Sequence, residues 1–187
     1  MSIENQDVEI MIALKGGDAT AFEKILKKYE KPIINYIYRF IGDRAEAEDI
    51  TQEVFLRVYK SKDSYKPTAK FSTWLYKIAT NLCIDYKRKI NRDAIGYSGT
   101  ELSNKLKDTT SSNPVESSLE REQLEEIIKI SLSSLPENQR IALTLKVYEN
   151  KSYQEISEIL GCSVSAVESL IFRARQNLKE KLSFLKQ

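Results

Sequence analysis

The residues from 71 to 89 combine side chains that suit nucleic-acid binding. The segment FSTWLYKIATNLCIDYKRK begins with aromatic residues, carries hydroxyl and amide groups through its middle and ends in three cations. At about 100° per residue its apolar side chains gather on one face, which predicts a core position for Phe71, Trp74, Leu75, Ile78 and Leu82. The other face gathers Thr73, Lys77, Thr80, Asn81, Lys87 and Arg88. A basic track beside amide and hydroxyl groups is typical of nucleic-acid surfaces, but the pattern does not distinguish a single strand from a duplex.

A second basic surface is predicted in the segment from 152 to 182. Two helical stretches flank Gly161 and Cys162, a turn too short for an antiparallel hairpin, and Ser163 is placed to cap the second stretch. Such spacing is typical of a helix-turn-helix unit, whose second helix enters the major groove. A wheel of that helix turns outward Ser165, Ser169, Phe172, Arg173 and Gln176. Arg173 suits a guanine, whereas Arg175 at the flank suits a phosphate. The alternative is an αα-hairpin with a solvated charged face.

An acidic helix is predicted from residue 44 to about residue 60. Its core face carries Ala47, Ile50, Val54 and Val58, and its opposite face carries Asp49, Gln52, Glu53, Leu56 and Tyr59. An apolar Leu56 among carboxylates favours docking of a basic partner helix over a merely solvated face. A Mg²⁺ site at Glu46, Asp49 and Glu53 is the remaining alternative, but no second acidic cluster is available to complete it.

The composition leaves few routes to catalysis. Histidine is absent and the only cysteines are Cys83 and Cys162. This excludes Ser-His-Asp and Cys-His mechanisms and any zinc site built from cysteine and histidine. We therefore expect a non-enzymatic protein without a metal or cofactor. The net charge of +2 conceals a segregated distribution, acidic at 43–53 and basic at 77–92 and 173–181, which indicates partners of opposite charge.

The elements that must position these groups are all predicted to be helices. Apolar residues recur at steps of three and four through most of the chain, except from about 91 to 117, which is rich in Ser, Thr, Asn, Asp and Gly. The sequence therefore predicts an all-α protein with a helical bundle at 1–92, a flexible linker at 93–117 and a helix-turn-helix domain at 118–187. The polar N-terminus and the absence of a long apolar run predict a cytoplasmic protein without membrane insertion.

Four stretches in register resemble one protein family. They are DRAEAEDITQEVFLRVY, KFSTWLYKIATNLCIDYKRK, the polar linker and LPENQRIALTLKVYENKSYQEISEILGCSVSAVESLIFRAR. Together they resemble the extracytoplasmic-function (ECF) sigma factors of the sigma-70 superfamily, over nearly the whole chain after about residue 18. The resemblance implies a promoter-specificity subunit that binds core RNA polymerase, at the β′ coiled coil and the β flap. It also implies recognition of −10 and −35 promoter DNA, nucleation of promoter melting and an anti-sigma factor as a further partner.

The resemblance assigns site residues to three surfaces. Core polymerase docking carries over to Asp49, Gln52, Glu53 and Leu56. Reading of the −10 element, where a base is flipped out of the stack, carries over to Ser64, Tyr65, Lys70, Thr73, Asn81, Lys87 and Arg88. Reading of the −35 element carries over to Ser163, Ser165, Ser169, Phe172, Arg173, Arg175 and Gln176, in a helix less basic than in many relatives.

Two other classes of function compete with this interpretation. A helix-turn-helix regulator would bind duplex DNA alone and use its N-terminal domain for sensing or dimerisation. A metal-dependent nucleic-acid enzyme is disfavoured by the missing histidines. The exposed Leu56 and the basic 77–92 segment also disfavour the regulator, since neither suits a closed ligand pocket.

Overall fold

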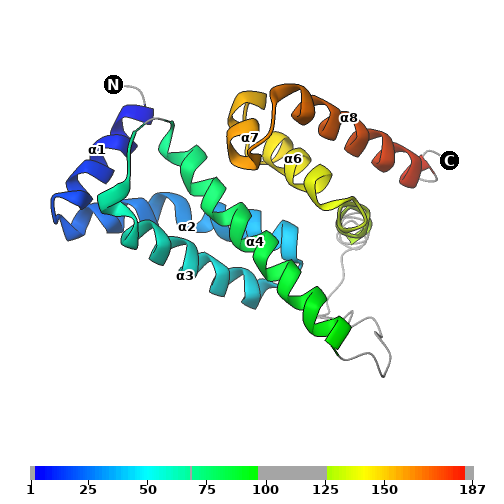
Figure 1. Ribbon diagram of the computed structural model, residues 1–187, viewed down its shortest axis with the longest axis horizontal. Helices are drawn as coiled ribbons and strands as arrows, with labels where there is room; N and C mark the ends of the chain where they lie inside the picture. Colours follow the sequence, from blue (N-terminus) through cyan, green and yellow to red (C-terminus); the bar gives the residue numbers. More distant parts are fainter. Residues whose placement is uncertain (1–2, 68, 97–125, 184–187) are drawn as a thin grey trace, which may run out of the picture.

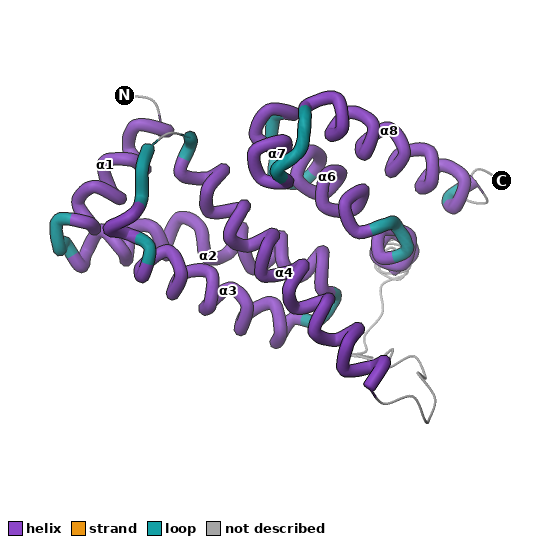
Figure 2. Tube along the Cα trace, in the orientation of Figure 1, coloured by secondary structure: helices purple, strands orange, loops and turns teal. Residues whose placement is uncertain are grey.

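In a computed structural model, residues 3–67, 69–96 and 126–183 are described, and the regular elements within these ranges are helical (Figures 1 and 2). The prediction of an all-α chain is confirmed. The N-terminal domain, residues 3–96, contains α1 (Ile3–Lys15), α2 (Ala19–Ile41), α3 (Arg44–Lys60), the 3₁₀ turn η1 (Lys62–Ser64) and α4 (Phe71–Gly96). The C-terminal domain, residues 126–183, contains a helical segment at 126–133, then α6 (Glu137–Val147), α7 (Tyr153–Leu160) and α8 (Val164–Lys181).

Local capping signals fix the ends of α2 and α3. The Asp18 carboxylate accepts the N–H of Thr20 at 2.9 Å and begins α2. Gly42, at φ 86°, ends α2 in the left-handed conformation that suits glycine. Asp43 follows at once and its carboxylate accepts the N–H of Glu46 at 3.1 Å, which starts α3. Because only two residues separate the helices, α2 and α3 form a tight antiparallel pair (Figure 1).

The first helix, α1, was not predicted from the sequence. Its Met11 and Leu14 are buried in the core. Asp7, which looked like part of a polar terminus, is also buried, and its carboxylate accepts hydrogen bonds from Lys28 and from the Tyr29 hydroxyl, the latter at 2.6 Å. These bonds tie α1 to α2.

The core of the N-terminal domain lies between α2, α3 and α4. All four residues predicted for the core face of α3 are buried, and so are Phe71, Leu75 and Leu82 of α4. Trp74 and Ile78 are half-buried against the same core. A buried hydrogen bond of 2.7 Å joins the Tyr36 hydroxyl of α2 to the Thr80 hydroxyl of α4. Thr80, which the helical wheel placed on the polar face, is therefore buried and helps to hold α4 against α2.

The C-terminal domain contains the predicted helix-turn-helix. Ser152 and Glu155 form a reciprocal capping box that begins α7, and Gly161, at φ 66°, ends it. Ser163 then caps α8 by accepting the N–H of Ala166 at 3.2 Å. Buried Ile156, Val167 and Ile171 fill the angle between the two helices. The turn fixes α7 across the inner face of α8.

The two domains contact each other directly. α7 packs against α4, and α6 contacts α2, although the chain segments involved are far apart in the sequence (Figure 1). The predicted linker at 93–117 lies outside the described residues from residue 97 onward, and α4 continues to Gly96. Within the described ranges, no helix has both the length and the apolar character required to cross a bilayer.

Candidate nucleic-acid interface

A hollow of about 400 Å³ lies where the loop after α3 meets the first turns of α4. It is lined by Arg57, Ser61, Ser64, Tyr65, Lys66, Trp74, Ile78 and Asn81. Its volume is within the range of small-ligand pockets. The fold brings two neighbouring predicted residues at the end of η1, Ser64 and Tyr65, together with a third, Asn81 of α4.

Aromatic rings form the apolar part of the hollow. The ring centroids of Tyr65 and Trp74 are 5.1 Å apart, and Phe71 supports both rings at 6.1 and 5.8 Å. Burial, and next the charge of Asp7, raises the pKa of the Tyr65 hydroxyl. The hydroxyl has no hydrogen-bond partner among the described residues, so Tyr65 contributes its ring and not a titrating group. The arrangement supplies a stacking surface next to polar side chains.

Polar and cationic groups form the rim of this hollow. Asn81 and Ser64 are exposed, and the Ser64 hydroxyl donates to the Ser61 carbonyl at 3.0 Å. Arg57 is oriented by Glu53, with 2.9 Å between Nε and Oε1. Sequence reasoning missed Arg57 and Ser61 as lining residues, because a wheel of one helix does not show what a neighbouring element places beside it.

The other residues predicted for this surface lie elsewhere. Arg88 is exposed farther along α4. Thr73 is only 3% exposed, and its hydroxyl has no hydrogen-bond partner among the described residues. Lys70 forms an ion pair with Glu155 of the C-terminal domain, at 3.5 Å between nitrogen and oxygen. Lys87 is half-buried, and burial, followed by the charge of Arg140, lowers its pKa. Of the predicted set, Ser64, Tyr65 and Asn81 thus line the hollow, Lys70 and Lys87 lie at or near the contact with the C-terminal domain, and Thr73 and Arg88 belong to neither.

A larger groove runs between α2 and α3. Gln52 and Leu56, both predicted, line it, while Asp49 is exposed and Glu53 is half-exposed outside it. Its apolar wall is formed by Phe22, Leu26, Ile34, Phe55, Leu56 and Tyr59. The Phe22 and Tyr59 rings meet edge to face with centroids 5.3 Å apart. The predicted acidic face is therefore the border of an apolar groove, to which α2 contributes as much as α3.

The exposed side of α8 matches the predicted recognition face. Ser165, Ser169, Arg173 and Gln176 are exposed, and Phe172 is 63% exposed. Ser163 differs in role, because its hydroxyl is occupied as the cap of α8. Arg175 lies on another side of the helix, beside an apolar hollow that is lined by Ile128, Leu132, Leu143, Val147 and Leu178. The structure thus separates Arg175 from Arg173.

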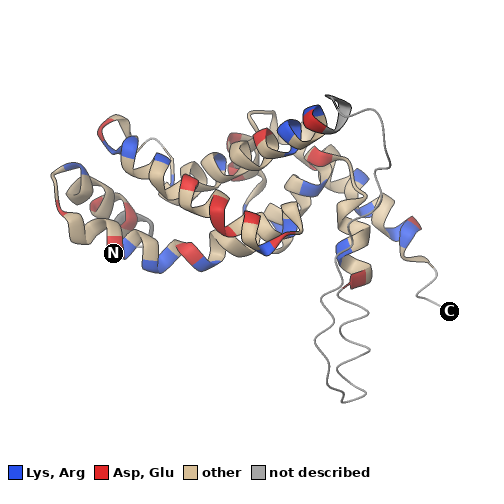
Figure 3. Cartoon of the chain, turned by 90° about the horizontal axis from the view of Figure 1, so that it is seen from below, with Lys and Arg blue, Asp and Glu red and all other residues tan. Residues whose placement is uncertain are grey.

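A helical bundle joined to a helix-turn-helix domain, with cations exposed on both domains, has the features of a DNA-binding transcription protein (Figure 3). The Sigma-70 region 2 family model matches residues 25–93, and the Sigma-70 region 4 model matches residues 126–178. The chain belongs to the ECF family of RNA polymerase sigma factors.

Curated relatives cover the chain almost completely. The RNA polymerase sigma-H factor of Pseudomonas aeruginosa is 32% identical over 189 residues, which cover 97% of this chain and 96% of that protein. The ECF RNA polymerase sigma-E factor of Escherichia coli K12 is 33% identical, with 97% of each chain covered. The protein is therefore a non-enzymatic initiation factor that binds core RNA polymerase and promoter DNA and directs the polymerase to promoters.

Solved structures share the fold. CnrH, in a complex with the cytosolic domain of CnrY, has a TM-score of 0.72 at 21% identity, over 95% of this chain and 97% of CnrH. The sigma factor RpoE of Bartonella quintana, in a complex with the anti-sigma factor NepR, has a TM-score of 0.69 at 22% identity, over 87% of this chain and 96% of RpoE. The match of residues 25–93 to region 2 excludes the regulator alternative, in which this domain would sense a ligand.

Proposed function

We propose that the hollow beside α4 captures an unstacked base of the −10 element, and that this capture nucleates promoter melting. The observation that carries the proposal is the meeting of Trp74, Tyr65, Ser64 and Asn81 at one hollow. A base taken out of the duplex needs an apolar surface on which to stack and polar groups for its edge. Trp74 and Tyr65 supply the first, and the Asn81 amide and the Ser64 hydroxyl supply the second.

Cations around the hollow would hold the strand that carries this base. Lys66 and Arg57 lie at the rim, and Arg88 is exposed two turns beyond Asn81 on α4. Unstacking a base costs on the order of a few kcal/mol. Phosphate contacts from these cations offset that cost without reading sequence, so the affinity for promoter DNA should decrease steeply with salt.

The outward face of α8 would read the −35 element in the major groove. Arg173 presents a bidentate donor, and Ser169 and Gln176 lie on the same side of the helix. Ser163 and Ser165, at the start of α8, suit contact with the DNA backbone, because a helix N-terminus favours phosphate. Arg175 stays at the flank, where a phosphate or a protein partner can reach it.

Two apolar surfaces would hold core polymerase. The α2–α3 groove, with Leu56 exposed and Asp49 beside it, suits a helix with basic residues, such as the β′ coiled coil. The apolar hollow of about 440 Å³ in the C-terminal domain, with Val147 at its edge, suits the β flap. An anti-sigma factor is a further proposed partner, supported by the NepR complex of the Bartonella quintana relative.

Asn81 provides the residue test. Open complexes are formed with sigma-free core polymerase on promoters selected from genomic fragments, and unpaired thymines are detected with permanganate. Asn81→Ala should reduce strand opening about ten-fold, the scale of one buried hydrogen bond to a base, and leave core binding unchanged. Asn91→Ala, on an exposed turn of α4 away from the hollow, is the matched control. Equal loss of core binding and strand opening in Asn81→Ala would contradict base capture.

A further inference from the structure

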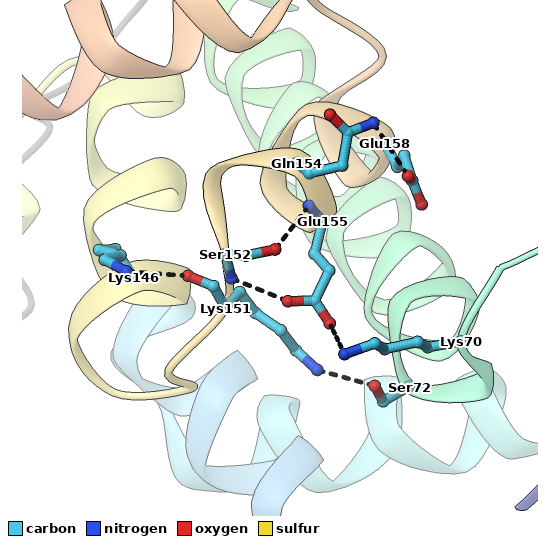
Figure 4. A network of polar contacts seen from close by, with 8 residues as sticks. All are labelled: Lys70, Ser72, Lys146, Lys151, Ser152, Gln154, Glu155 and Glu158. Atoms are coloured by element: carbon cyan, nitrogen blue, oxygen red, sulfur yellow. Dashed lines mark hydrogen bonds and ion pairs between the residues drawn. The ribbon is translucent and has the colours of Figure 1, made fainter. Parts of the chain in front are cut away.

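Acidic side chains of the C-terminal domain contact cations of the N-terminal domain. Glu155, in the first turn of α7, lies 3.5 Å from Lys70 at the start of α4 (Figure 4). Glu149, in the turn between α6 and α7, lies 3.4 Å from Arg39 of α2 and accepts a hydrogen bond from the Tyr76 hydroxyl of α4. Neither carboxylate is freely exposed: the side-chain exposures are 14% for Glu155 and 9% for Glu149.

A lysine of the C-terminal domain completes this interdomain contact. Lys151 is 8% exposed and donates from Nζ to the Ser72 hydroxyl at 2.9 Å (Figure 4). Its Nζ also lies 4.7 Å from the centre of the Tyr76 ring. Farther along, Arg140 of α6 stacks over Phe40 of α2 at 4.3 Å. Charged and polar side chains thus form part of the interdomain contact, beside one buried apolar cluster that includes residues of both domains.

The interdomain contact covers part of the surface proposed to bind the −10 element. Lys70 is paired with Glu155, and Lys87 is half-buried near Arg140. The hollow itself remains open, with Asn81 exposed at its rim. The C-terminal domain therefore competes for phosphate-binding cations of α4 and leaves the base-binding groups accessible. A carboxylate on Lys70 holds the position that a phosphate oxygen would take.

We infer that this contact is an autoinhibitory clamp, in which Glu149 and Glu155 hold the C-terminal domain against α4 and reduce the affinity of the free sigma factor for single-stranded −10 DNA. The inference rests on the proposed function of α4. Release of the clamp requires a competitor for the same charges or a partner that separates the domains. Core polymerase is such a partner if it binds both apolar surfaces at once. Free protein would then engage DNA weakly until it joins the polymerase.

The test uses the full-length chain with Glu149→Gln and Glu155→Gln combined. Glutamine still accepts the Tyr76 hydroxyl and can still fill the capping box of α7, so the change removes charge with little effect on folding. Glu158→Gln with Glu180→Gln is the matched control, because it removes two charges from α7 and α8. Glu158 accepts a hydrogen bond from the Gln154 side chain of its own helix at 3.2 Å (Figure 4), and Glu158 and Glu180 are both exposed. The control corrects for the general gain in DNA affinity from a higher net charge.

Two measurements are made on each protein. Small-angle scattering at low salt reports domain separation, and fluorescence anisotropy with a labelled 12-nucleotide random single strand reports DNA affinity. We expect the clamp variant to be more expanded than the control and to bind the strand about five-fold more tightly, the scale that two partly exposed charge pairs allow. The unmodified chain should expand on its own in about 0.5 M NaCl, where such pairs are screened.

Specific results would overturn the inference. Unchanged scattering in the clamp variant would show that the carboxylates do not hold the domains together. Expansion with the same DNA affinity as the control would show that the contact does not inhibit binding. A separate variant tests the proposed function. If Asn81→Ala combined with Arg88→Ala binds the strand as tightly as the unmodified chain, α4 does not bind single-stranded DNA, whatever the scattering shows.

Discussion

Replacement of Leu56 by alanine tests the α2–α3 groove as the polymerase-docking site. Full burial of a leucine side chain is worth about 2 kcal/mol, and the 43% of Leu56 that is exposed leaves roughly 0.9 kcal/mol to be gained on docking. This corresponds to an increase of about four-fold in the Kd for core polymerase. Counting an equal area on the partner raises the expected increase to about twenty-fold.

The assay is biolayer interferometry with immobilised sigma-free core polymerase. Ile12→Ala is the matched control, because Ile12 is 58% exposed but lies on α1 and does not line the groove. Thermal unfolding of both variants must match that of the unmodified protein. If Leu56→Ala weakens core binding no more than Ile12→Ala does, the groove is not the docking site.

Three further predictions concern the scaffold and the titrating groups. Tyr36→Phe should lower the free energy of unfolding by about 1–2 kcal/mol, because it leaves the buried Thr80 hydroxyl without its partner at 2.7 Å. Tyr36→Phe with Thr80→Val should recover most of this loss in urea titrations, and a double variant no more stable than the single one would contradict the reasoning. Burial raises the pKa of Cys83 to about 12, so in the folded protein at pH 8 a thiol reagent should label the half-buried Cys162 and leave Cys83 unmodified until urea unfolds the chain. Although burial opposes ionisation of Glu155, hydrogen bonds from Ser152 and the charges of Lys151 and Lys70 lower its pKa below the ordinary 4.5. A lowered pKa stabilises the fold above the ordinary value, and this stability is lost as the pH falls through the folded value. Acid unfolding should therefore be less steep in Glu155→Gln, and identical pH profiles would exclude this role.

The helix-turn-helix was predictable because its signals are local. Gly161 marks the left-handed end of α7, Ser163 caps α8, and the apolar spacing lies within thirty residues of sequence. The outward face of α8 followed from the same periodicity. Arg175 was already expected at the flank, but periodicity could not show the apolar hollow beside it, which includes residues of α6 and of the segment at 126–133.

The surface of α4 was harder to predict because tertiary contacts decide it. Lys70 looked like a free cation until α7 placed Glu155 beside it, 85 positions along the chain. Thr73 fell on the polar side of the wheel and is nevertheless buried. Helix α1 was missed for a related reason: its Asp7 reads as a solvated acid, and only the position of Tyr29 reveals a buried hydrogen bond. Periodicity describes one helix and not the helices packed against it.

Helix α3 carries two sites on consecutive residues. Leu56 lines the α2–α3 groove, and Arg57 lines the hollow beside α4. Neighbouring positions on an α-helix differ by about 100° in direction and 1.5 Å in height, so this step of one residue sets the angle between the two sites. If core polymerase docks at Leu56, as we propose, it would also orient the hollow at Arg57 without a hinge between them. Insertion of a single residue between the two would rotate the rest of α3 by about 100°, which would turn Val58 out of the core and Tyr59 out of the groove, so the length of α3 is part of both sites.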